Sequence, residues 1–105
     1  MTEKTQDRWQ SVQNDIVDFS NRTFGKGRLD AKLLHLAEEV GELAETPDDL
    51  MEWADCMILL LGAAGEAGLD MDDLHRAVAE KMEINSKRKW GRPDENGVVR
   101  HVDAV

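Results

Sequence analysis

The chain has 105 residues and a formal net charge of −9, from 22 acidic against 13 basic side chains. This length suits one small domain with a modest core. The acidic balance excludes a general affinity for nucleic acid, which requires a basic surface, so we expect no nucleic-acid partner. It does not exclude an anionic small molecule, provided that a cation bridges the two.

The cysteine content and the apolar segments predict a cytoplasmic protein. Cys56 is the only cysteine, so we expect no disulfide, a reducing cytosol and a packing role for this side chain. The polar N-terminal residues lack the apolar stretch of a signal peptide. The apolar run that begins at Cys56 is far shorter than the roughly 18 residues of a membrane span, so we expect no membrane association.

Apolar residues recur at helical spacing in four segments, which predicts an all-α fold. We expect helices over about residues 5–22, 30–45, 48–67 and 70–90, in a compact four-helix bundle that forms a single domain of residues 1–105. The apolar stripe of the first helix consists of Trp9, Val12, Ile16 and Phe19. The tail, residues 91–105, has a turn signal at Asn96-Gly97 and is compatible with a short hairpin or a flap over the site.

Capping residues mark the predicted helix ends. We expect Asp30 to be the N-cap of the second helix and an acid after Pro47 to cap the third. Asp70 with Asp73 should cap the fourth helix, and Gly68 should end the third.

Two carboxylate pairs stand out on the second and third helices. The third helix is apolar on all sides after Asp55, which indicates the most buried helix of the bundle. Its first turn nevertheless carries Glu52 and Asp55, three apart and so on one face. Glu39 and Glu42 flank the apolar face of the second helix. Because carboxylates are rarely buried without a partner, these acids call for an explanation.

The short turn around Pro47 makes the second and third helices an antiparallel hairpin. Glu42 and Glu52 are equidistant from Pro47, as are Glu39 and Asp55, so each pair should lie at one level. Four carboxylates then converge on one patch. The patch could be a solvated acidic face or a set of partly protonated acids. The interpretation we favour is a site for Mg²⁺ or Mn²⁺ with oxygen ligands.

The fourth predicted helix carries a face that changes from apolar to basic. Lys81, Asn85 and Arg88 follow one another at i, i+4 and i+7 on this face. Counting back from the turn at Gly68 places Asn85 level with Glu52. These cations could simply complement the dipole at the helix C-terminus. Facing the acids, they would instead complete a metal–polyphosphate site, in which metal-bound water attacks phosphorus.

Two absences narrow the chemistry further. The sequence has no P-loop, so a Gly-rich turn does not cradle the phosphates. It also has no Glu-x-x-His pair, which counts against a ferritin-like di-iron centre. His35 lies on the Glu42 side of the second helix, where it either supports a metal ligand or is incidental.

These residues together resemble the MazG-like all-α nucleoside-triphosphate pyrophosphohydrolases. Their signature is similar to Glu39-x-x-Glu42 followed by Glu52-x-x-Asp55, and to Lys81-x-x-x-Asn85-x-x-Arg88 on the last helix. The stretch from Trp90 to Val102 resembles the dATP/dGTP diphosphohydrolase branch, which is common in phages and bacteria. The resemblance extends from about Trp9 to Val102.

The resemblance implies Mg²⁺-dependent cleavage of a (deoxy)nucleoside triphosphate, with a purine base, to a monophosphate and pyrophosphate. It implies that Mn²⁺ can substitute, and that the protein works as a homodimer or homotetramer in a bacterial or phage-infected cytosol. The four acids become catalytic metal ligands: Glu39, Glu42, Glu52 and Asp55. Lys81, Asn85 and Arg88 become phosphate or sugar contacts, and Asn14 and Phe24 become base contacts. The segment between the two acid pairs, Leu43–Met51, is shorter than in many relatives, which leaves the base preference open.

Two other classes of function remain open from the sequence. The protein could be a non-catalytic helical interaction module, whose acids form a solvated or partner-binding surface. The net charge alone would also suit an acidic nucleic-acid mimic. Neither alternative requires a basic stripe that faces the acids.

Overall fold

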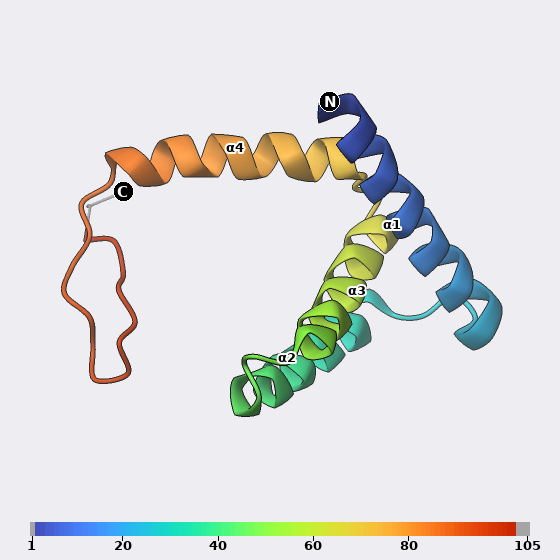
Figure 1. Cartoon of the computed structure of the whole chain (residues 1–105), viewed down its shortest axis with the longest axis horizontal. Coiled ribbons are helices and arrows are strands. Elements are labelled where there is room, and N and C mark those ends of the chain that lie inside the picture. Colours follow the sequence, from blue (N-terminus) through green and yellow to red (C-terminus); the bar gives the residue numbers. More distant parts are fainter. Residues whose placement is uncertain (1, 103–105) are drawn as a thin grey trace. The chain divides into compact units, whose positions relative to one another are not determined.

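The computed structural model describes residues 2–102, which form four helices (Figure 1). They are α1 (Thr2–Phe24), α2 (Leu29–Glu45), α3 (Leu50–Glu66) and α4 (Met71–Lys87). Within these residues the only β-type pairing is one antiparallel bridge between Trp90 and His101, so the all-α prediction is confirmed. None of the described helices has the length and apolarity needed to cross a bilayer.

The chain divides into two compact units, Met1–Asp73 and Leu74–Val105, which we describe separately. The first unit contains α1, α2, α3 and the first turn of α4. The second contains the rest of α4 and the tail. A single domain of residues 1–105 therefore stays a prediction.

The helix ends differ from the prediction at two places. Helix α4 ends at Lys87 rather than near residue 90, because the residues after it pair with the end of the tail: the amide of Gly91 donates to Arg100 (2.8 Å). Arg28, not Asp30, is the N-cap of α2. Asp30 lies in the first turn instead, where its carboxylate accepts the amide of Ala31 and complements the helix dipole.

The link between α3 and α4 has the predicted caps. Gly68 has a φ of +85°, which a residue with a side chain rarely adopts. The amides of Gly68 and Leu69 donate to Gly65 and Ala64, the Schellman pattern at a helix C-terminus. Asp70 and Asp73 then exchange side chain-to-amide hydrogen bonds of 3.1 and 2.8 Å at the start of α4.

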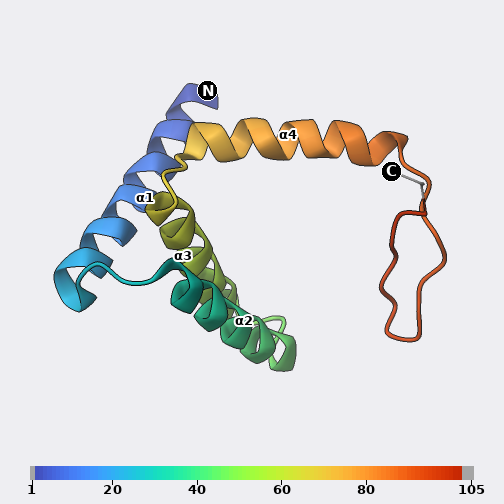
Figure 2. The same ribbon diagram turned by 180° about the vertical axis from the view of Figure 1, so that it is seen from behind.

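Helix α3 lies between α1 and α2 and contacts both (Figures 1 and 2). The fully buried residues of this helix are Leu61, Gly62 and Ala63. We expected the apolar run to be buried on all sides, and this is only partly so. Ile58 and Leu60 are each 47% exposed, which leaves an apolar surface on the helix that should be most buried.

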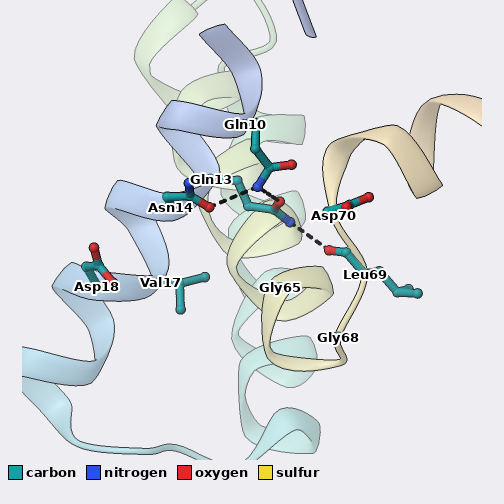
Figure 3. A pocket seen from close by; sticks show the side chains of 9 residues that line it. All are labelled: Gln10, Gln13, Asn14, Val17, Asp18, Gly65, Gly68, Leu69 and Asp70. Atoms are coloured by element: carbon teal, nitrogen blue, oxygen red, sulfur yellow. Dashed lines mark hydrogen bonds between the residues drawn. The ribbon is translucent and has the colours of Figure 1, made fainter. Parts of the chain in front are cut away.

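A glutamine, not an apolar residue, forms the centre of the α1–α3 contact. Gln13 is 2% exposed, and its amide donates to the carbonyls of Leu61 (3.1 Å) and Leu69 (3.0 Å). Gln10 donates to Gln13 (Figure 3). It also accepts the amide of Met71, the first residue of α4. The predicted stripe of α1 is therefore wrong in phase: Trp9, Val12 and Phe19 are more than 40% exposed.

The close approach of α1 and α3 gives a stability prediction. A Cβ atom at Gly65 would lie 2.7 Å from Cγ2 of Val17, whereas one at Gly41 meets nothing within 4 Å. In an open helix Gly→Ala stabilises by about 0.5–1 kcal/mol, and overpacking costs about 1–3 kcal/mol. Denaturant unfolding should therefore show that Gly41→Ala raises and Gly65→Ala lowers the free energy of unfolding. An equal gain from both would contradict the α1–α3 contact.

Candidate metal centre

The turn between α2 and α3 sets the level of the acids on the two helices. The amide of Thr46 donates to Leu43 (3.1 Å) and that of Asp49 to Thr46 (3.0 Å). The indole of Trp53 closes the turn by donating to the carbonyl of Pro47 (2.9 Å). Asp49 caps α3 by accepting the amide of Met51. The two helices therefore lie antiparallel from this turn onward.

This hairpin brings the acids together. Glu39, Glu52 and Asp55 each offer one carboxylate oxygen, and these oxygens lie within 4.8 Å of one another. Glu42 adjoins them, because it has the largest influence on the pKa of Glu39. Glu39 and Glu52 are half-buried, and Asp55 is exposed. We call this group of four residues the acid cluster.

The acids disfavour one another's charge. The hydrogen bond with Glu42 raises the pKa of Glu39, and partial burial and the charges of Glu42 and Asp55 add to the effect, against a small opposing effect of His35. Partial burial, followed by the charges of Glu42, Asp55 and Asp49, raises the pKa of Glu52. A cation among these carboxylates would reverse both effects.

Two carboxylate oxygens of the acid cluster are unsatisfied hydrogen-bond acceptors. Oε2 of Glu39 and Oε2 of Glu52 are buried, and neither accepts a hydrogen bond from any described residue. A buried, unpaired carboxylate oxygen costs more than a neutral one. A divalent ion that prefers oxygen ligands fits this set of donors.

A pocket of about 350 Å³ is lined mainly by the end of α1 and the start of α2. Its lining includes Phe24, Lys32, His35 and Leu59. Nε2 of His35 lies 3.4 Å from Oε1 of Glu39, so the pocket reaches the acids through this histidine. Phe24 is 74% exposed, and its ring lies at 85° to that of Phe19, with centroids 6.0 Å apart.

A family model described as dATP/dGTP pyrophosphohydrolase matches residues 12–104. The chain belongs to the dATP/dGTP pyrophosphohydrolase family. It is also similar to a solved structure, a cyanophage S-2L MazG-like pyrophosphohydrolase bound to dGDP and three catalytic Mn²⁺ ions per active site. The TM-score is 0.75 at 32% identity, over 89% of this chain and 95% of that one. The MazG-like fold is thereby confirmed.

Relatives of this family member come from phages. It is 33% identical over 91 residues to the Eaa protein of Salmonella phage P22, and 40% identical over 92 residues to a dATP/dGTP diphosphohydrolase of Salmonella phage PMBT28. Each match covers 87% of the chain but only 29% and 30% of those relatives. A third relative, the dATP/dGTP diphosphohydrolase of cyanophage S-2L, is 43% identical over 74 residues, which cover 69% of the chain and 64% of that protein.

The other predicted contacts of this pyrophosphohydrolase family member do not all lie near the acids. Asn14 lines a different pocket, of about 510 Å³, beside Gly65, and accepts a hydrogen bond from Gln10 (Figure 3). Gly65 is ten residues beyond Asp55 on α3, which corresponds to about 15 Å. Lys81, Asn85 and Arg88 belong to the second unit, so their approach to the acids stays a prediction.

Sequence reasoning missed a polar contact at the other end of the α2–α3 pair. Nζ of Lys32 lies 2.7 Å from the Ser20 hydroxyl and 3.7 Å from Oε1 of Glu66, and it is mostly shielded. Its spacing from Leu36 and Glu39, at i+4 and i+7, was the available signal. The inward face of α2 follows this spacing. Leu33 and Val40, which we expected on that face, are 48% and 50% exposed.

Proposed function

We propose that the protein is a metal-dependent (deoxy)nucleoside-triphosphate pyrophosphohydrolase. It converts a purine dNTP and water to the monophosphate and pyrophosphate, in a bacterial or phage-infected cytosol. The observation that carries this proposal is the acid cluster, with its two buried and unpartnered carboxylate oxygens, in a member of this family.

The metal is Mg²⁺, with Mn²⁺ as a substitute. Glu39, Glu42, Glu52 and Asp55 would hold it, because they supply the hard oxygen ligands that both ions accept. When bound, such an ion acidifies a water molecule and neutralises phosphate oxygens. The chain's own contribution is to keep the four carboxylates fixed on two helices that one short turn aligns.

The other parts of the nucleotide, its sugar and its base, bind residues outside the acid cluster. Lys81, Asn85 and Arg88 contact its phosphates or sugar, and the exposed ring of Phe24 stacks on the base. His35 orients Glu39 from the same pocket. Asn14, on α1, lies beside Gly65, about 15 Å along α3 from Asp55. This is too far for a nucleotide held by the acid cluster of the same copy, so the base contact of Asn14 would be to a nucleotide held by a second copy.

The biological unit is a homodimer or homotetramer. Among the described residues the buried hydrophobic side chains are only Leu61 and Ala63, whereas large apolar side chains on all three helices of the first unit are exposed. Surfaces of this kind are typical of protein–protein interfaces. An isologous helical contact with another copy would cover them.

The main alternative is an acidic helical interaction module without catalysis. The deciding experiment is incubation of the protein with each common nucleotide and Mg²⁺, followed by separation of the products. We expect pyrophosphate and the monophosphate from dATP or dGTP. Orthophosphate with a diphosphate would mean that a different bond is cleaved. An absence of turnover with every nucleotide would favour the interaction module.

A further inference from the structure

The residues after α4 form a closed hairpin within the second unit. The amide of Gly91 donates to the carbonyl of Arg100 (2.8 Å), and that of Val102 to the carbonyl of Lys89 (2.9 Å). Trp90 and His101 form the antiparallel bridge between the two arms. We call residues 89–102 the C-terminal hairpin.

One carboxylate orders the turn of this hairpin. Asp94 Oδ1 accepts the amides of Asn96 (2.8 Å) and Val98 (3.0 Å), and Oδ2 accepts a hydrogen bond from Arg100 (2.6 Å). These bonds, with that of Arg100 the strongest, hold the pKa of Asp94 below its ordinary value. Val98 is 46% exposed. The backbone adds two bonds, from the amide of Asp94 to Val98 and from the amide of Gly97 to Asp94 (both 2.9 Å). The turn is therefore held by polar bonds rather than by an apolar core.

The C-terminal hairpin is fixed to the end of α4 at Asn85. The indole N–H of Trp90 donates to the carbonyl of Asn85 (3.0 Å), which also accepts the amide of Arg88 (3.3 Å). The ring of Trp90 meets that of His101 edge to face, with centroids 6.2 Å apart. Between residues 75 and 90, Asn85 and Arg88 are the two half-buried positions, and the others are exposed.

We propose that the C-terminal hairpin positions Asn85 and Arg88 for the nucleotide, with Trp90 and Asp94 as the positioning residues. This inference rests on the proposed function, in which Asn85 and Arg88 contact phosphate or sugar. A binding residue whose backbone is already fixed loses less conformational freedom when it binds a ligand. Without the hairpin, Asn85 would lie on the last, fraying turn of α4, and Arg88 would directly follow that turn.

The test compares nucleotide KM and kcat for three variants and the unchanged protein. Trp90→Phe keeps a ring beside His101 but removes the bond to Asn85, and Asp94→Ala removes the acceptors that order the turn. Both should raise KM about tenfold and change kcat less than about threefold. Their thermal shift with Mn²⁺ should be unchanged, because the acid cluster lies in the other unit. Glu95→Gln, an exposed acid in the same turn, is the matched control.

A double-mutant cycle separates positioning from general stability. If Trp90 acts through Asn85, Trp90→Phe should raise KM less in an Asn85→Ala protein than in the unchanged one. Additive effects, or an unchanged KM in Trp90→Phe while the unchanged protein turns over nucleotide, would overturn the inference and leave the proposed function intact. If the unchanged protein hydrolyses no nucleotide, the proposed function fails first and the inference fails with it.

Discussion

Glu52→Gln should reduce kcat/KM by more than about 100-fold. Loss of a residue that only supports a metal ligand typically costs 10–100-fold, so loss of a ligand should cost at least as much. The same change should leave the metal-free protein as stable as before, or more so. Glu52 has a raised pKa because it is partly buried and lies near Glu42, Asp55 and Asp49, and an uncharged amide removes that repulsion.

The control for this prediction is Glu45→Gln. Glu45 is an exposed acid on the same hairpin and is not among the acids gathered by the turn. Glu45→Gln should keep full activity. Both variants lose one negative charge, so they differ only in the position of the loss. Asp55→Asn should reproduce the loss seen with Glu52→Gln. Turnover preserved in either of these two variants would remove that residue from the site.

The sequence predicts the acid cluster well because its geometry depends on little besides one turn. Equal counts from Pro47 fix the relative level of the two acid pairs, and helical rise does the rest. The turn is held locally, by Trp53 and Asp49, so no distant contact can change it. The helix caps at Gly68 and Asp70 are local for the same reason.

The packing faces are harder to predict, since periodicity reports apolar character and not what covers it. On α1 the stripe with Trp9 and Phe19 is the more apolar one, yet the residue buried against α3 is Gln13. Gln13 can be buried because the carbonyls of Leu61 and Leu69 accept its amide hydrogens. An apolar stripe that a second copy covers is indistinguishable in sequence from one that the chain covers itself.

The sequence predicts a short hairpin or a flap for the tail, but it does not predict how the hairpin is held, for a different reason. The sequence shows a turn signal at Asn96-Gly97, and Gly97 has a φ of +82°. The rest of the hairpin depends on Asp94, which bonds four residues along and six residues along the chain. Such side-chain hydrogen bonds have no periodic pattern. The end of α4 was consequently predicted three residues too late.

The second large effect should be a pH-dependent stabilisation by metal. Mg²⁺ or Mn²⁺ at 100 times its Kd should raise the free energy of unfolding by about 2.7 kcal/mol near pH 8, and far less at pH 5. The pKa values of Glu39 and Glu52 are raised above their ordinary value of 4.5 in the folded protein. Protons therefore compete with the metal for these carboxylates at low pH.

Without metal, the stability of the protein should change with pH in the opposite direction. Between the ordinary and the raised pKa values, the folded state binds more protons at Glu39 and Glu52 than the unfolded state does. The stability contributed by these two acids is present below pH 4.5 and is lost as the pH rises through their folded pKa values. Thermal melting should thus be measured from pH 5 to 8, once with EDTA and once with metal. The difference between the two melting temperatures should grow as the pH rises. Curves that stay parallel would mean that the metal does not bind at these carboxylates, and Glu52→Gln should bring the two curves together.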